Sequence, residues 1–319
     1  MNRTRVAIGV DIGGGSVKLG LVSEGGKILK RDSFLTPRSP RRKVLLNLLQ
    51  DHILKLVTDA KQNNLKCVGV GIGAPGPIDV ERGFVYFFPN IPGWKNTPLK
   101  ALLQRKINLP VFVDNDANVM ALAEFRFGAG LGVRNIVALT LGTGIGGGLV
   151  IDGTLFHGPT YSAAEIGHLV IDEKGALCGC GNRGCVETFV GTNYFVKEMK
   201  KRLATGQKSF LNQWIKKGAK LTPQLAAQAA RRGDKFAVQI WCETAEHLGT
   251  ALAGLVNILN PQKIILGGGL AQSGDLLFKP LRRAILKKAF SVAGASVKVL
   301  PAKLGMDAGI VGAAAMVFE

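Results

Sequence analysis

The sequence predicts an α/β protein with two lobes. Two observations lead to this prediction: apolar strand-like segments alternate with amphipathic helical segments, and a glycine-rich turn follows an apolar strand early in each half of the chain. The chain has 319 residues, 47% of them hydrophobic, which is long for one core and natural for two. We therefore expect sheets that are covered by helices.

The first half opens with three strand-like runs separated by glycine turns, which predict an antiparallel meander. Apolar residues then recur at helical spacing from Val44 to Val57, and strands and helices alternate after them. Strands are expected at residues 6–11, 17–23, 27–34, 67–72, 84–88 and 110–113, and helices at residues 42–63 and 99–107.

The second half repeats this opening. An apolar strand at residues 135–141 runs into a glycine turn, and Gly148-Leu-Val150 echoes Gly20-Leu-Val22 of the first half. The echo suggests a duplication with a cleft between the halves, although it is short enough to arise by chance. Further helices are expected at residues 193–204, 210–217, 223–231, 234–259 and 309–317, with Thr222 as N-cap of the third, and a strand at residues 263–266. The predicted lobes are residues 1–117 with 305–319, and residues 118–304.

The net charge of +19 at pH 7 admits nucleic acid, a membrane surface or anionic small molecules as partners. The basic residues are scattered, mostly over predicted helices and without interleaved aromatic residues, so we expect a solvated basic surface and no nucleic-acid site. The sequence has no secretory signal pattern and no apolar run that would span a membrane, which predicts a cytoplasmic protein without a membrane partner. Cys67 and Cys242 are expected to be buried free thiols.

Three glycine-rich turns follow apolar strands, where backbone N–H groups can approach phosphate oxygens closely. Asp11 begins the first turn, and a carboxylate that faces phosphates needs Mg²⁺ between them. A hairpin turn explains any one of the three equally well, but three together favour phosphate binding. The predicted nucleotide contacts are Asp11, Gly13, Gly14, Gly15, Ser16, Lys18, Gly142, Thr143, Gly144, Gly267, Gly268 and Gly269.

Carboxylate and amide groups gather in the run Asp114-Asn115-Asp116, at the end of a predicted strand. Polar side chains at the carboxyl end of a strand are well placed to bind a polyol substrate. Phosphoryl transfer to an alcohol requires a group that accepts the hydroxyl proton, which a carboxylate can do. Asp116 would also serve as the N-cap of the next helix, and the two roles are compatible.

One short segment contains four residues with the spacing of zinc ligands, namely His168, Cys178, Cys180 and Cys185. Three thiolates and an imidazole form a closed tetrahedral shell, which predicts structural zinc because catalytic zinc keeps one position open for water. Glycines at 179, 181 and 184 allow the loop to turn its sulfurs inward. Glu165 and Glu187 flank this loop, either as solvated surface charges or as rigidly held groups that bind sugar hydroxyls.

Taken together, these residues resemble the ROK family of sugar kinases and related repressors, within the hexokinase and actin-like ATPase superfamily. The resemblance covers nearly the whole chain and rests on the segments Asp11 to Lys18, Gly73 to Asp79, Pro89 to Trp94, Asn115 to Asn118, Leu141 to Gly148, Glu165 to His168, the cysteine loop and Leu266 to Gly269. It implies a two-lobed actin-like ATPase (ribonuclease H-like) fold with a cleft between the lobes. One departure is Gly15, where the family usually carries threonine, and Ser16 would supply the missing hydroxyl.

The resemblance implies an ATP-dependent hexokinase of the glucokinase type, with ATP and Mg²⁺ at the glycine turns and structural Zn²⁺ at the cysteine loop. It implies that Asp116 is the catalytic base and that the sugar is contacted by Asn115, Asp116, Glu165, His168 and Glu187.

Several alternatives stay open. Fructose, mannose or an N-acylhexosamine could replace glucose, and polyphosphate could replace ATP. A non-catalytic sugar-responsive regulator is the rival outside the enzyme class. The intact Asp116 and the lack of the N-terminal winged-helix region of the family's repressors argue against a regulator. A homodimer is expected because dimers are common among the proteins that the chain resembles.

Overall fold

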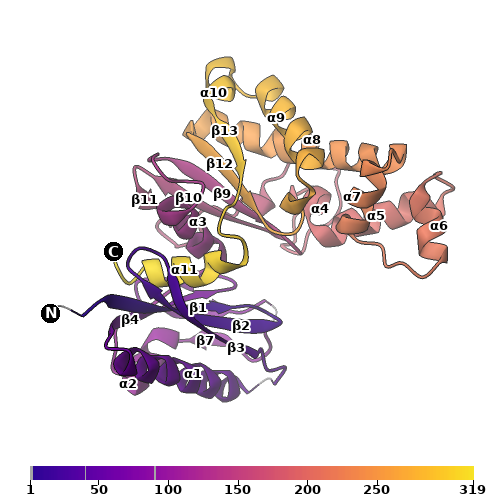
Figure 1. Cartoon of the computed structure of the whole chain (residues 1–319). Helices are drawn as coiled ribbons and strands as arrows, with labels where there is room; N and C mark the ends of the chain where they lie inside the picture. Colours follow the sequence, from indigo (N-terminus) through magenta and orange to yellow (C-terminus); the bar gives the residue numbers. More distant parts are fainter. Residues whose placement is uncertain (1–2, 40, 90) are drawn as a thin grey trace. The chain divides into compact units, whose positions relative to one another are not determined.

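The computed structural model describes residues 3–39, 41–89 and 91–319 (Figure 1). Contacts within the chain define two compact units. Unit 1 contains Met1–Gly132, Gly148–Ala164 and Lys303–Glu319, and unit 2 contains Val133–Gly147 and Glu165–Ala302. Asn90, which belongs to one of the family segments, lies outside the described residues.

The sheet of unit 1 has the strand order β3-β2-β1-β4-β8. The first three strands pair antiparallel, which confirms the predicted meander, and β4 and β8 add parallel pairs. The strands are β1 (Arg5–Ile12), β2 (Ser16–Ser23), β3 (Ile28–Leu35), β4 (Lys66–Ala74) and β8 (Val111–Asn115), and a separate small sheet holds β5 (Ile78–Asp79), β6 (Phe84–Phe87) and β7 (Lys95–Thr97).

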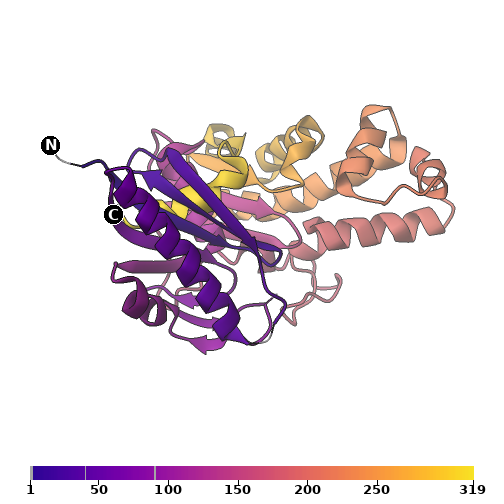
Figure 2. The same cartoon turned by 60° about the horizontal axis from the view of Figure 1, so that its bottom comes forward.

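Helices cover both faces of this sheet. Figures 1 and 2 show α1 (Arg42–Gln62) and α2 (Leu99–Ile107) on one face and α11 (Ala308–Ala315) on the other. The buried residues of α1 are Leu45, Leu49, Ile53, Leu56 and Ala60. Val44 was expected on the same face but is 38% exposed, because the buried stripe of α1 is narrower than the predicted one.

Helix α11 packs directly against backbone, which requires glycine at three positions. A Cβ atom on Gly9 of β1 would overlap the carbonyl of Ile310, and one on Gly71 of β4 would overlap the carbonyl of Ala313. Gly312 of α11 likewise leaves room for the backbone of α3 (Asp116–Phe127). The strands β1 and β4 are therefore fixed against the C-terminal helix with little space to move.

The second sheet has the order β11-β10-β9-β12-β13, which repeats the strand arrangement of the first. The pair β10 and β11 is antiparallel, whereas β12 pairs parallel with both β9 and β13. This repetition supports the duplication suggested by the sequence echo. The strands are β9 (Ile136–Leu141), β10 (Ile145–Ile151), β11 (Thr154–Leu155), β12 (Lys263–Gly267) and β13 (Lys298–Pro301), and the division between the two units runs through β10.

Most of unit 2 outside its strands is helical. The prediction that Thr222 caps a helix is confirmed, because its hydroxyl accepts from the N–H of Leu225 at 3.1 Å. Elements between residues 275 and 301 were not assigned from the sequence. The helices of unit 2 are η1 (Ile166–His168), α4 (Glu187–Val190), α5 (Thr192–Ala204), α6 (Phe210–Lys216), α7 (Pro223–Arg231), α8 (Lys235–Leu259), η2 (Ala271–Ser273), α9 (Asp275–Lys288) and α10 (Ser291–Ser296), and η3 (Gly305–Asp307) belongs to unit 1.

The compact units differ in extent from the predicted lobes, whose boundaries stay a prediction. Helix α3 belongs to unit 1, because Val119 packs beside Gly73 of β4 and Gly312 of α11. The expectation that Cys242 is buried was wrong: its side chain lies on the exposed side of α8. Among the described residues, no helix has the length and apolar character needed to span a membrane.

Candidate functional site

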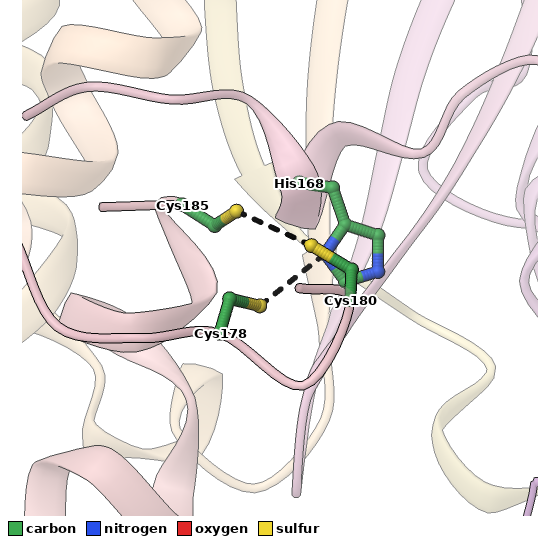
Figure 3. A group of neighbouring side chains, drawn as sticks. All are labelled: His168, Cys178, Cys180 and Cys185. Atoms are coloured by element: carbon green, nitrogen blue, oxygen red, sulfur yellow. Dashed lines mark hydrogen bonds between the residues drawn. The ribbon is translucent and has the colours of Figure 1, made fainter. Parts of the chain in front are cut away.

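A compact loop in unit 2 brings together the four side chains that were predicted as zinc ligands (Figure 3). One ligand atom from each of His168, Cys178, Cys180 and Cys185 lies within 4.8 Å of the others. The distance from His168 Nδ1 to Cys178 Sγ is 3.6 Å, and the Sγ atoms of Cys180 and Cys185 are also 3.6 Å apart. Ligands of a tetrahedral zinc ion with bonds of about 2.0–2.3 Å are separated by about 3.5–3.8 Å, so these distances fit zinc.

The thiols of this loop differ in their readiness to lose a proton. Burial raises the pKa of Cys178 and also that of Cys185, the latter to about 12. A hydrogen bond from the N–H of Asn182 lowers the pKa of the exposed Cys180. Because zinc deprotonates the thiols it binds, two buried thiols facing an imidazole are chemically suited to a metal ion.

Two of the three glycines in the loop adopt backbone conformations that favour glycine. Gly181 has φ of 97° and Gly184 has φ of 67°, and a Cβ atom on Gly184 would overlap the carbonyl of Asp172. Gly179 has open space around it and an ordinary φ. The turn that points the sulfurs inward therefore depends on Gly181 and Gly184.

His168 presents its two ring nitrogens to different neighbours. Nδ1 faces Cys178, whereas Nε2 lies 3.9 Å from a carboxylate oxygen of Glu165. Histidines that bind zinc through one nitrogen commonly direct the other toward a carboxylate, which fixes the ring. This geometry allows His168 to bind zinc through Nδ1 while Nε2 and the exposed Glu165 remain available to a substrate.

Glu187 connects the cysteine loop to the second glycine turn. Its Oε2 accepts from the N–H of Ile145 at 2.9 Å, and its Oε1 lies 4.0 Å from Cys178 Sγ. A Cβ atom on Gly144 would overlap this carboxylate, so Gly144 is needed for its approach. The sequence predicted a sugar contact for Glu187, and the structure adds a backbone contact that no local pattern could indicate.

The second and third glycine turns lie together in unit 2. Gly268 has φ of 87° and approaches the backbone of Leu141 so closely that a Cβ atom would overlap it. The N–H of Leu270 also donates to the carbonyl of Leu141, at 3.2 Å. The N–H of Thr192, the first residue of α5, donates to the carbonyl of Gly142 at 2.9 Å. Two of the predicted phosphate turns thus form one structural group.

The first glycine turn lies in unit 1, between β1 and β2. Asp11 is paired in register with Lys18 across the hairpin, and a Cβ atom on Gly309 would lie 2.6 Å from the carboxylate carbon of Asp11. Burial raises the pKa of Asp11 and outweighs the opposite effect of Lys18. A bound cation would favour the ionised carboxylate, so the position suits Mg²⁺. Ser16 and Lys18 also line a cavity of about 480 Å³.

The first turn has a support that the sequence analysis missed. The hydroxyl of Thr36 donates to the carbonyl of Gly13 at 2.5 Å, and the N–H of Thr36 donates to the carbonyl of Gly15 at 3.2 Å. Thr36 follows the third strand and belongs to no recognisable motif, so only the folded meander reveals its role.

Asn115 and Asp116 lie where β8 ends and α3 begins. The expectation that Asp116 caps this helix was wrong: Asn115 is the N-cap, and its Oδ1 accepts from the N–H of Ala117 at 2.9 Å. Asp116 is instead the first residue of the helix, where the dipole favours a negative charge. In the parallel register, Asp11 pairs with Gly73 and Gly73 pairs with Asp114, so Asp11 and Asn115 lie at the same edge of the sheet.

The buried Asp114 and the half-buried His157 form a pair that no sequence pattern predicted. Asp114 is 3% exposed, and one of its oxygens accepts from His157 Nε2 at 2.7 Å. Burial lowers the pKa of His157, but the hydrogen bond and charge of Asp114, with a contribution from Glu319, outweigh burial and raise it. The two residues are 43 positions apart and no spacing rule connects them.

The predicted site residues therefore form two groups, one in each compact unit. Unit 1 contains the first glycine turn and the Asn115–Asp116 step, and unit 2 contains the metal loop with Glu165 and Glu187 and the two other glycine turns. A cavity of about 520 Å³ in unit 2, beside α5 and α8, is lined by none of the predicted site residues.

The ROK family matches the chain from residue 7 to residue 319. A glucokinase from Thermotoga maritima is 40% identical over 316 residues, which cover 98% of this chain and 97% of that protein. A xylose repressor from Caldicellulosiruptor bescii is 35% identical over 98% of this chain and 78% of its own length.

A solved structure is similar over nearly the whole chain. It is a ROK family glucokinase from Streptomyces griseus in complex with glucose and AMPPNP, with a TM-score of 0.80 and 37% identity, covering 98% of each chain. The relatives thus include proteins named as kinases and proteins named as repressors.

Proposed function

Because the chain belongs to the ROK family, we propose that it is an ATP-dependent hexose kinase whose preferred acceptor is the 6-hydroxyl of glucose. The observation that carries this proposal is the position of Asp116 at the start of α3, at the sheet edge that also holds Asp11. The glucokinase from Thermotoga maritima and the Streptomyces griseus enzyme bound to glucose and AMPPNP support the substrate class.

Asp116 is the proposed catalytic base. Its carboxylate takes the proton of the sugar hydroxyl while that oxygen forms a bond to the γ-phosphorus and the bond to the ADP oxygen breaks. Asp116 lies in the first turn of α3, where the helix dipole favours a negatively charged side chain. Asn115, which fixes the start of the helix, is proposed to contact the sugar as well.

The nucleotide is proposed to bind at the glycine turns. Their backbone N–H groups, with the hydroxyls of Ser16 and Thr143 and the ammonium of Lys18, supply donors for phosphate oxygens. Asp11 is the proposed ligand of Mg²⁺, which supplies positive charge next to the phosphates. Polyphosphate is the alternative donor, since a basic chain with phosphate-binding turns would also attract it.

The metal loop is proposed to orient the sugar contacts of unit 2. A zinc ion bound by His168 and the three cysteines would hold the imidazole whose Nε2 faces Glu165, and it would also fix the start of α4, where Glu187 lies. Glu165, His168 and Glu187 would each bind a sugar hydroxyl. The homodimer is likewise proposed, and sedimentation of the purified protein tests it.

A panel of acceptors and donors tests the preferred substrates. We expect the kcat/KM for glucose with ATP to exceed that for mannose, fructose, N-acetylglucosamine and N-acetylmannosamine, and to exceed that for glucose with polyphosphate. A different best sugar would revise the acceptor and leave the kinase proposal intact. If no sugar on the panel stimulates ADP formation, the kinase proposal is wrong.

A sugar-responsive regulator is the second candidate function, because xylose repressors are among the similar proteins. This candidate predicts sugar binding without turnover and salt-dependent DNA binding with a sequence preference. Sugar-stimulated ADP formation together with an absence of sequence-preferring DNA binding would exclude it.

A further inference from the structure

Asp114 is a buried carboxylate at the base of the helix that carries Asp116. One oxygen accepts from His157 Nε2 at 2.7 Å, and the other accepts from Asn118 Nδ2 at 3.0 Å and from the N–H of Asn115 at 2.6 Å. These donors belong to the loop after β11, to the first turn of α3 and to the end of β8. One carboxylate thus links three segments of unit 1.

The contacts of Asp114 determine the position of the residue that starts the helix. The backbone N–H of Asn115 donates to the carboxylate of Asp114. The side-chain Nδ2 of Asn115 donates to the carbonyl of Gly76 at 3.1 Å, and its Oδ1 caps α3. Asp116 follows directly. A shift of Asp114 would therefore move the start of α3 and the carboxylate of Asp116 with it.

Of the three groups that donate to Asp114 among the described residues, the imidazole of His157 is the one that can carry a charge. The side chain of His157 is 24% exposed and that of Asp114 is 4% exposed. A buried carboxylate has lost its contact with water, and its neighbours must compensate for that loss. Removal of a charged donor leaves the negative charge without an oppositely charged partner, which is strongly unfavourable. Removal of the His157 donor is therefore expected to rearrange the groups around Asp114.

We propose that His157 is a positioning residue for phosphoryl transfer, which holds Asp114 and thereby fixes Asn115 and Asp116 in the geometry needed to accept the sugar proton. This inference rests on the proposed kinase function. In this role His157 contacts no reacting atom and acts only through Asp114.

The charged state of His157 is expected to influence the reaction. The groups that face the imidazole are Asp114 of β8, the C-terminal Glu319, which lies 3.8 Å from Arg126 of α3, and the ring of Tyr161 at 6.5 Å between centroids. Asp114 raises the pKa of His157, so the imidazolium persists above the ordinary pKa of about 6.5. As the pH rises through that raised pKa, the charge is lost and the bond to Asp114 weakens.

A second histidine–aspartate pair in unit 1 offers a matched control. His52 Nδ1 lies 3.0 Å from Asp32 Oδ2, and the His52 side chain is 22% exposed, close to the value for His157. Asp32 also receives the ammonium of Lys55 at 3.1 Å, and its pair joins α1 to β3 rather than to the start of α3. Loss of this pair should affect stability without changing the position of Asp116.

The experiment compares kcat, the KM for glucose and the melting temperature of His157→Phe, His157→Gln, His157→Asn and His52→Phe with wild type, from roughly pH 6 to pH 9. The glutamine Nε2 can occupy the place of the histidine Nε2, whereas the asparagine amide falls short of it. We expect kcat to fall about tenfold or more for His157→Phe and His157→Asn with little change in KM, and to recover to within about threefold of wild type for His157→Gln. The wild-type kcat should decline by no more than about threefold at high pH, because neutral His157 can still donate through Nε2 as the glutamine amide does, and His157→Gln should lack that decline.

Two results would overturn this inference in an enzyme that forms ADP in response to glucose. One is a kcat for His157→Phe and His157→Asn within about twofold of wild type, and the other is an equal loss for His52→Phe. If His157→Phe does not fold, the contrast between the glutamine and asparagine variants decides. A wild-type protein without sugar-stimulated ADP formation would instead refute the proposed function on which the inference rests.

Discussion

The two hairpin turns that begin the two sheets occupy equivalent places in strand order but are supported differently. The turn between β1 and β2 has its carboxylate within the strand itself, because Asp11 is the second-last residue of β1 and Gly309 of α11 leaves room for it. The turn between β9 and β10 has no such residue and receives Glu187 from the start of α4, next to the metal loop. The comparison suggests that one turn depends on helix packing and the other on a metal-binding loop.

The largest effect is expected for Asp116→Asn. This residue follows β8 of the first sheet directly. The amide cannot accept the hydroxyl proton, so kcat for glucose phosphorylation should fall by about 10² to 10⁴-fold. Measurement of sugar-stimulated ADP formation at saturating substrates checks this expectation. Asp275→Asn, which changes a carboxylate at the exposed start of α9, is the control and should retain wild-type kcat.

The second expected effect concerns the metal loop. Cys180→Ser should lower the zinc content, the melting temperature and the affinity for glucose together, with activity reduced by about 10 to 100-fold. Metal analysis, thermal melting and calorimetric titration with glucose measure the three quantities. Cys242→Ser removes another exposed thiol, on α8, and should change none of them. Unchanged glucose affinity in zinc-free protein would break the link between metal and sugar.

A smaller effect is expected from the contact between Glu187 and the second turn. Gly144→Ala would displace the Glu187 carboxylate and leave the N–H of Ile145 without it, which should destabilise the protein by about 1–3 kcal/mol and raise the KM for glucose. Gly179→Ala places a methyl group in open space within the metal loop and serves as control. Chemical denaturation and steady-state kinetics would reveal the difference, and equal behaviour of the two variants would contradict the role of Glu187.

The smallest effect is expected at Gly309 of α11, which leaves room for the Asp11 carboxylate of the first turn. In Gly309→Ala, the added methyl group would press on the Asp11 carboxylate, so we expect the KM for ATP to rise by about threefold to tenfold while zinc content and the KM for glucose stay unchanged. The opposite pattern, with glucose affected and ATP unaffected, would contradict the proposed role of Asp11 at the nucleotide phosphates.

The sequence revealed features that depend on local order and missed those that depend on distant contacts. Helical spacing predicted α1 within one residue at its end, and the cysteine spacing predicted a cluster whose ligand atoms do meet. The cap of α3 was predicted at Asp116 and lies at Asn115, because Asp and Asn are comparable N-caps and only the backbone shows that Asn115 precedes the first helical residue.

The contacts around the candidate site were beyond prediction for a physical reason. Thr36 supports a turn 23 positions earlier, Glu187 binds the N–H of Ile145 across 42 positions, and His157 reaches Asp114 across 43. Each is a single polar residue outside any periodic pattern. The burial of its side chain and the partner it faces are therefore determined only by the folded arrangement of the sheets.

The most direct test of the central claim, that this chain is a hexose kinase, is to incubate the purified protein with glucose and Mg·ATP and identify the product by ³¹P NMR. We predict glucose 6-phosphate and ADP in equal amounts, formed only when sugar is present. ATP hydrolysis without a phosphorylated sugar, or no reaction in folded protein that contains zinc, would contradict it.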